Sequence, residues 1–268
     1  MSVIEAVFFD VDFTLIYPGP MFEASGYRGF CARHGMVVDE SRFGAASRSA
    51  AAILDGLEDV PYDAALYIEY AKHIITAMGG RGPGVEACAR EIYDEWAACR
   101  HFELYDEVPA VLRELVGAGI RLGLISNSHR RLDTFQSHFD LQGLITATVS
   151  SSEHGFMKPH PNIFSAALRL VDVPAAAAVM VGDSLRHDVE GALGAGMRAV
   201  LLHRGPEPHP RTAELLARGV PVVASLRELP GLLIGDSDRT SPEATEGFDR
   251  PVDAGGCERQ SGRRPGSC

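Results

Sequence analysis

Short hydrophobic runs alternate with amphipathic stretches along most of this chain. The first run covers residues 4–9, and the later runs follow one another at the spacing of strand–helix units. These later runs cover residues 122–125, 144–149, 177–181, 199–202 and 220–223. Between them, residues 108–116 and 162–170 carry apolar side chains at helical spacing. Strands that are apolar at nearly every position are typical of sheets covered on both faces, so the pattern predicts an α/β fold with a parallel sheet.

A long segment, residues 17–105, separates the first predicted strand from the others, and we call it the helical insertion. Its periodicity predicts helices over residues 22–34, 63–78 and 85–100. An insertion of this length predicts a second small domain, joined to the core through hinge-like linkers near residues 17–20 and 102–107. The predicted core therefore consists of residues 1–16 and 106–234.

The composition changes after Ile234. Residues 235–268 are rich in Gly, Ser, Asp, Arg and Pro and have few large apolar side chains. Such a segment cannot bury enough apolar surface to offset the entropy that it loses on ordering. We therefore predict a disordered C-terminal tail over these residues.

Charge and composition exclude several classes of function. The 268 residues carry a formal net charge of −11, which disfavours a nucleic-acid surface because such surfaces need clustered Lys and Arg. The N-terminal residues lack the basic leader of a secretory signal, and no apolar run reaches the roughly 18 residues that a membrane span needs. The five cysteines are scattered without metal-ligand spacing, which indicates a reducing compartment. We predict a soluble, cytoplasmic protein without nucleic-acid or membrane partners, of unspecified oligomeric state.

Polar side chains stand beside the ends of several predicted strands. They are Asp10 and Asp12 after the first strand, Ser126 and Asn127 at the end of the second, Lys158 before the fourth, and Asp183 and Asp188 after the fourth. Ligands of open α/β sheets bind at the carboxyl ends of the strands. We therefore expect four carboxylates, a hydroxyl group and a lysine to meet at one edge of the sheet.

Such a cluster is suited to phosphoryl chemistry. Several carboxylates cannot share a small site in ionised form unless a cation is present, and oxygen ligands without Cys or His suit a hard ion such as Mg²⁺. A metal, a lysine and a hydroxyl group form a cradle for a phosphoryl group. One carboxylate can attack phosphorus, while a second one protonates the leaving oxygen and later activates water.

In this order, the residues resemble the four motifs of the haloacid dehalogenase (HAD) superfamily of hydrolases. Residues 10–14 (DVDFT) resemble its first motif, D-x-D-x-T, and Ser126 resembles its second, a Ser or Thr that ends a strand. Lys158 followed by Pro159 resembles the third motif, and residues 182–188 match the fourth, G-D-x₄-D. The resemblance implies a Rossmann-like core, with a small helical cap of the C1 type inserted after the first strand.

The resemblance also implies a role for each matching residue. Asp10 would be the nucleophile and a metal ligand, and Asp12 would be the general acid and base, with its backbone carbonyl on the metal. Lys158 would bridge the nucleophile and the phosphoryl group. Asp183 would bind Mg²⁺, and Asp188 would bind this ion or orient its ligands.

Three more residues would serve the phosphate side of the site together with Lys158. By the same resemblance, Ser126 would donate a hydrogen bond to a phosphoryl oxygen, and Asn127 would contribute through its backbone. Thr14 would support the loop after the first strand. These roles imply a Mg²⁺-dependent phosphomonoester hydrolase that acts on a small phosphorylated metabolite through an aspartyl-phosphate intermediate.

Other functions compatible with these residues are a haloacid dehalogenase or phosphonate hydrolase on the same fold, a non-catalytic phosphorylation switch, and a catalytically idle scaffold. Asp12 favours a phosphatase, because the dehalogenase branch of the family does not carry Asp at the acid/base position. Phe13 departs from the Gly or Asp that is common there, which leaves the substrate preference open.

Some residues near the motifs have a simpler interpretation. We expect His129, Arg130 and Arg131 to be surface residues at the start of a helix, with contact to a substrate as the alternative. The aromatic residues of the helical insertion are expected to form its own hydrophobic core. They are Phe22, Phe30, Tyr67 and Trp96.

Overall fold

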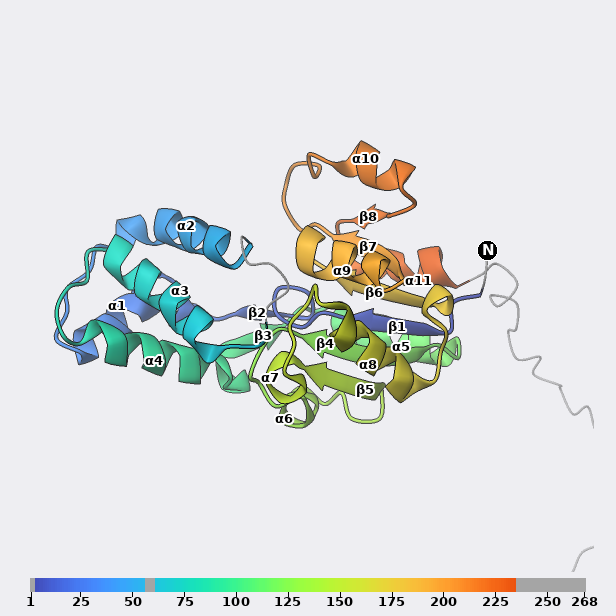
Figure 1. The fold of residues 1–268 in the computed structure, drawn as a ribbon, viewed down its shortest axis with the longest axis horizontal. Helices are drawn as coiled ribbons and strands as arrows, with labels where there is room; N and C mark the ends of the chain where they lie inside the picture. The colour runs from blue at the N-terminus through green and yellow to red at the C-terminus, as the bar shows by residue number, and fades with distance from the viewer. Residues whose placement is uncertain (1–2, 56–60, 235–268) are drawn as a thin grey trace, which may run out of the picture.

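The computed structural model describes residues 3–55 and 61–234 of the chain. The tail predicted over residues 235–268 lies outside the described residues. Figure 1 shows a sheet flanked by helices, with the helices α1 to α4 gathered to one side of it. Within the two described ranges, no helix has the length and apolar character needed to cross a bilayer.

A sheet of six parallel strands, in the order β5-β4-β1-β6-β7-β8, forms the core. The strands are β1 (Ala6–Phe9), β4 (Arg121–Ser126), β5 (Ile145–Ser150), β6 (Ala178–Gly182), β7 (Arg198–Leu202) and β8 (Val222–Val223). Each strand overlaps one of the apolar runs in the sequence, so the predicted parallel α/β sheet is confirmed. In the centre, Phe9 of β1 lies opposite Leu124 of β4 and Val181 of β6.

Helices cover both faces of this sheet. They are α5 (Val108–Gly117), α6 (Leu132–His138), α7 (Ser151–His154), α8 (Pro161–Val171), α9 (Gly191–Gly194), α10 (Thr212–Ala217) and α11 (Leu229–Leu233). Successive side chains of a strand point to opposite faces. Phe9 accordingly packs in one buried cluster with Leu112 of α5, and Phe8 packs in another with Phe164 of α8. Burial on both faces fixes β1, and with it the position of the residues that follow it.

The described part of the helical insertion, residues 17–55 and 61–105, contains four α-helices. They are α1 (Ala24–Arg33), α2 (Phe43–Asp55), α3 (Ala64–Ala77) and α4 (Val85–Trp96). The sequence pattern predicts ranges for α1, α3 and α4 but gives no separate range for α2, which buries Ala46 and Ala50.

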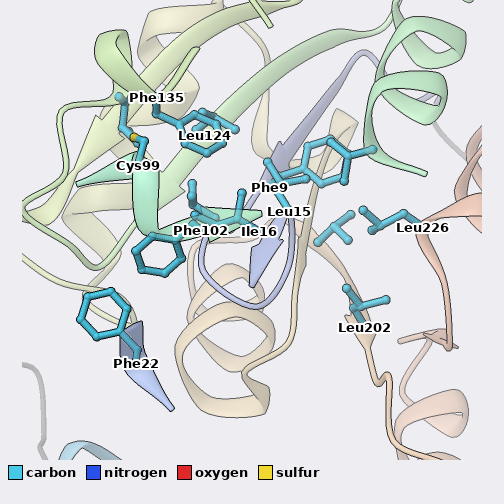
Figure 2. Packing of buried hydrophobic residues seen from close by; sticks show 14 of the residues in the cluster. Phe9, Leu15, Ile16, Phe22, Cys99, Phe102, Leu124, Phe135, Leu202 and Leu226 are labelled. Atoms are coloured by element: carbon cyan, nitrogen blue, oxygen red, sulfur yellow. The ribbon is translucent and has the colours of Figure 1, made fainter. Parts of the chain in front are cut away.

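The two linkers of the insertion pair with each other. Strands β2 (Ile16–Pro18) and β3 (Phe102–Leu104) form an antiparallel ribbon in which Ile16 lies opposite Leu104. Figure 2 shows Ile16 and Phe102 in the same apolar cluster as Phe9 of the central strand. The ribbon therefore holds the base of the insertion next to the carboxyl end of β1. The hinge predicted at these linkers stays a prediction.

Candidate active site

The carboxyl ends of β4, β1 and β6 converge on one polar cavity. Because these strands are neighbours in the sheet, the side chains that follow them are brought together from distant parts of the chain. The cavity has a volume of about 130 Å³. It is lined by Asp10, Asp12, Asn127, Lys158, Asp183, Ser184, His187 and Asp188.

Lys158 joins three segments of the cavity. Its ammonium group donates to Oδ1 of Asp10 at 2.6 Å, to Oδ1 of Asp188 at 2.7 Å and to the carbonyl oxygen of Ile125 at 2.8 Å. Burial alone would lower the pKa of this ammonium group, but the charges of Asp10 and Asp188 outweigh burial and raise the pKa above its ordinary value. Lys158 is therefore a charged group buried against two carboxylates. Each of its three N–H groups donates one hydrogen bond.

Three carboxylates face one another at the same place. Asp10, Asp183 and Asp188 each offer an oxygen atom, and these atoms all lie within 4.8 Å of one another. Burial, opposed by Lys158 and reinforced by the charge of Asp188, raises the pKa of Asp10. Burial and the charges of Asp10 and Asp188 also raise the pKa of Asp183 to about 8, although the charge of Lys158 opposes this shift. A hard divalent cation between these oxygens would remove the repulsion, so the donor set fits Mg²⁺.

Asp188 is held in place from both sides. Its Oδ2 accepts a hydrogen bond from the backbone N–H of Ser184 at 2.9 Å, while its Oδ1 accepts from Lys158. It belongs to a single turn of π-helix, Leu185–Glu190, a distortion that is frequent at functional sites. Gly182 is required beside it, because a Cβ atom at this position would lie 2.2 Å from Oδ2 of Asp188.

The carboxylate of Asp12 does not point into the cluster of three but pairs with Arg130. Nη1 of Arg130 donates to Oδ1 of Asp12 at 2.8 Å, and Nη2 donates to the carbonyl oxygen of Trp96 at 2.7 Å. The guanidinium carbon lies 4.3 Å from the ring centroid of Phe102. Burial raises the pKa of Asp12, and the charge of Arg130 opposes that shift.

Arg130 is thus not the surface residue that we expected from the sequence. Its side chain is completely buried, whereas its neighbour Arg131 is exposed and pairs with Asp133. The partners of Arg130 come from the loop after β1 and from the insertion, so no local pattern around residue 130 could have revealed its burial. A basic residue shortly after the second motif is the one signal that the sequence offers.

The second and third motifs are tied together through Asn127. Its side-chain nitrogen donates to the carbonyl oxygen of Lys158 at 2.8 Å, and its Oδ1 accepts from the backbone N–H of Lys158 at 2.7 Å. The backbone carbonyl of Asn127 in turn accepts from the hydroxyl group of Tyr67, in the insertion, at 3.0 Å. Asn127 therefore positions the backbone of the lysine, a contact that the sequence did not predict.

Ser126 and Thr14 are both buried, and neither is among the residues that line the polar cavity. Ser126 is buried at the end of β4, with its Oγ 2.9 Å from Oγ of Ser128. Thr14 is fully buried, its Oγ1 has no hydrogen-bond partner among the described residues, and it is not one of the residues that line the cavity. A direct phosphate contact of Thr14 or Ser126 stays a prediction.

Comparison with families of known proteins agrees with this geometry. Residues 4–196 match the family model described as haloacid dehalogenase-like hydrolase. Human N-acylneuraminate-9-phosphatase is 33% identical over 163 residues, which cover 54% of this chain and 58% of the human protein. The bovine haloacid dehalogenase-like hydrolase domain-containing protein 3 is 32% identical over 124 residues, covering 46% of this chain and 49% of that protein. These two alignments span roughly half of the curated relatives' own lengths.

Solved structures show the same fold. A HAD phosphatase from Thermococcus onnurineus superposes with a TM-score of 0.58 at 21% identity, covering 86% of this chain and 98% of its own. A 2-haloacid dehalogenase from Pseudomonas syringae superposes with a TM-score of 0.55 at 24% identity and with the same coverage. Because phosphatases and dehalogenases both resemble this chain, the fold alone does not choose between the two reactions.

Proposed function

Since this chain belongs to the haloacid dehalogenase-like hydrolases and is therefore an enzyme, we propose that it is a Mg²⁺-dependent phosphomonoester hydrolase of small metabolites. The observation that carries this proposal is the pairing of Asp10 with Lys158 in a cavity that Asp12 also lines. The phosphatase names of similar proteins, among them the N-acylneuraminate-9-phosphatases and a phosphoserine phosphatase of Thermus thermophilus, support it.

In the first step, a carboxylate oxygen of Asp10 attacks phosphorus and the bond between phosphorus and the ester oxygen breaks. Protonated Asp12 donates its proton to the departing alkoxide, which leaves as a neutral alcohol. Lys158 stays protonated beside Asp10 and reduces the repulsion between this carboxylate and the phosphoryl oxygens. The products of the step are an aspartyl-phosphate at Asp10 and an ionised Asp12.

In the second step, water attacks the phosphorus of the aspartyl-phosphate. Ionised Asp12 accepts a proton from this water, the acyl–phosphate bond breaks, and Asp10 is restored as a carboxylate together with inorganic phosphate. The raised pKa of Asp12 suits a group that must give and take one proton in each cycle.

Asp10, Asp183 and Asp188 would hold the Mg²⁺ ion, with the backbone carbonyl of Asp12 as a further proposed ligand. When bound, the ion supplies positive charge that neutralises the phosphoryl oxygens. The three clustered carboxylates support this part of the proposal, since Lys158 balances only one of their negative charges and a divalent cation would balance the other two.

The test is the release of inorganic phosphate from a panel of phosphorylated metabolites, with Mg²⁺ or with EDTA. Wild type is compared with Asp10→Asn and with Asp140→Asn as a control. Asp140 is exposed and has a left-handed backbone that Asn tolerates, so the control makes the same chemical change outside the cavity. We expect Asp10→Asn to lower kcat by more than about 10⁴-fold and the control to be unchanged.

The competing dehalogenase reaction is examined in the same samples by measuring halide released from 2-haloacids. Halide release without Mg²⁺, together with no phosphate release from any member of the panel, would replace the proposal by that alternative. Phosphate release that persists in Asp10→Asn would refute the covalent mechanism.

A further inference from the structure

A second cavity opens beside the polar one, between the core and the helical insertion. Its volume is about 190 Å³, and it shares Asp12 and Asn127 with the polar cavity. Its aromatic lining consists of Phe13, Tyr27, Tyr67, Tyr70, Tyr93 and Trp96. Trp96 packs against the buried Phe22, as expected for the core of the insertion, and it also borders this cavity. Tyr67, expected in the same core, borders the cavity as well.

The position of Asp12 indicates which part of the substrate would lie in the aromatic cavity. In the proposed reaction Asp12 protonates the oxygen of the leaving alcohol, so the alcohol must depart on the Asp12 side of the phosphoryl group. Asp12 is also a residue at which the polar and aromatic cavities meet. The aromatic cavity is thus placed to receive the alcohol, and the polar cavity is placed to receive the phosphoryl group.

The rings of the lining offer flat surfaces at the spacing of aromatic packing. The ring of Tyr93 lies over that of His129, with centroids 3.9 Å apart and planes at 13°. The centroids of Tyr67 and Tyr93 are 6.4 Å apart, and those of Phe13 and Trp96 are 6.3 Å apart. Aromatic groups at such distances stabilise a ring beyond the effect of apolar burial alone.

The charges around this cavity oppose a second anionic group on the substrate. None of the described residues that line it is Lys or Arg, and Arg130 beside it is already engaged with Asp12 and Trp96. Burial and the charge of Arg130 lower the pKa of His129, which keeps this residue neutral near pH 7. A carboxylate or second phosphate would therefore lose its hydration without gaining a cationic partner from the described lining.

The geometry points to a substrate class: phosphomonoesters whose alcohol carries one flat, uncharged ring, bound in the aromatic cavity. This inference rests on the proposed phosphatase function. The size of the cavity supports a single ring, because an apolar cavity of about 150 Å³ accommodates benzene. Phe13 supports it as well, since its ring is 45% exposed in the structure and would be covered by such an alcohol.

The experiment compares esters whose leaving groups are all primary alkoxides. The substrates are benzyl, 2-phenylethyl and propyl phosphate, together with the 4-carboxy derivatives of the two aromatic esters. With Mg²⁺, the better aromatic ester should exceed propyl phosphate in kcat/KM by about tenfold or more, as burial of a Phe-sized group predicts. Its 4-carboxy derivative should lose most of this advantage. Equal values for the aromatic and propyl esters, or for the neutral and carboxylated ones, would overturn the inference.

Two variants test the cavity itself. Phe13→Asn removes a ring while suiting the left-handed backbone at this position, and Tyr93→Leu removes the ring that stacks on His129. Each should reduce the ratio of aromatic to propyl ester by about 2- to 12-fold. Phe156→Leu is the matched control, because Phe156 stacks on His160 at 4.2 Å but lines neither cavity, and its ratio should equal that of wild type.

Binding separates this inference from the proposed function. Benzylphosphonate, 2-phenylethylphosphonate and propylphosphonate are titrated into the Mg²⁺-loaded protein, and Kd is measured by calorimetry. If no ester is hydrolysed but an aromatic phosphonate binds at least tenfold more tightly than propylphosphonate, the proposed function fails and the assignment of the cavity stands. If the esters are hydrolysed but the phosphonates bind equally, the assignment fails alone.

Discussion

Nη1 of Arg130 lies 2.8 Å from Oδ1 of Asp12, although 118 positions separate the two residues in the chain. The same guanidinium group donates to the carbonyl oxygen of Trp96 and stacks on Phe102, both of which belong to the helical insertion. Arg130 therefore connects the proposed acid and base of the reaction to the element that borders the aromatic cavity. We regard it as a positioning residue for Asp12.

Replacing Arg130 by lysine should destabilise the protein. A lysine cannot donate to both Asp12 and Trp96 with the fixed geometry of a guanidinium group, and it leaves part of a buried ion pair unmatched. We expect Arg130→Lys to reduce the free energy of unfolding by about 3 kcal/mol, measured by denaturant titration at pH 7. We also expect kcat to fall more than KM changes, since the proton donor is misplaced.

Arg131→Lys is the control for this experiment. Arg131 is adjacent in sequence but exposed, and its partner Asp133 is exposed too. A surface pair of this kind contributes little, so the change in stability should stay within about 0.5 kcal/mol. Equal effects of the two substitutions would show that the contacts of Arg130 do not matter.

The affinity for Mg²⁺ should increase with pH. Folding raises the pKa of Asp183 from 3.8 to about 8, so the metal-free folded protein favours protonated Asp183 and loses stability as pH rises through this range. Mg²⁺ must displace that proton at pH 6 but not above pH 8. Calorimetric titration should show affinity rising by up to about tenfold per pH unit between these values.

The proton released on Mg²⁺ binding gives an independent readout. Titrations at pH 6 in two buffers with different ionisation enthalpies should differ in apparent heat, and the difference should vanish near pH 9. The variant Asp183→Asn should bind Mg²⁺ weakly and lose most of the pH dependence. Affinity for the wild type that is the same at pH 6 and pH 8 would contradict the assignment of Asp183.

A methyl group at position 182 should disturb the metal site. Because a Cβ atom there would lie 2.2 Å from Oδ2 of Asp188, Gly182→Ala forces this carboxylate away from Ser184 and Lys158. We expect Mg²⁺ affinity to fall by about 10- to 100-fold, as happens when a residue that orients a metal site is displaced. Calorimetry and phosphate release both measure this loss.

Gly194→Ala provides the matched control. Apart from its chain neighbours and the backbone of its own helix α9, no atom of the described residues lies within 4 Å of a Cβ built on Gly194. Alanine in a helix restricts the unfolded chain more than glycine does, so this variant should be unchanged in Mg²⁺ affinity and more stable by about 0.4–1 kcal/mol. If both alanine variants lost Mg²⁺ affinity, the close approach at Gly182 would not be the cause.

Removing the side chain of Asn127 should loosen the backbone that presents the lysine. Asn127→Ala deletes both hydrogen bonds to Lys158 and leaves a buried N–H and C=O without these partners. We expect a loss of about 1–3 kcal/mol in the free energy of unfolding and a lower kcat. Asn162→Ala, at an exposed position at the start of α8, is the comparison and should behave as wild type in both measurements.

The core of the fold and the gathering of four polar residues were predictable because they depend on local order along the chain. Apolar runs mark the strands, and parallel strands place Asp10, Lys158, Asp183 and Asp188 at one edge whatever the details of packing.

The sequence by itself determined the class of fold, the family and the carboxylate–lysine cluster of this protein. Tertiary structure alone decided that Arg130 is buried against Asp12, that the two linkers pair as a ribbon, and that Tyr67 and Trp96 border a cavity. Each of these contacts joins segments that are far apart in the chain. These contacts depend on how the helical insertion packs against the core, and the hydrophobic pattern of a single segment does not specify that packing.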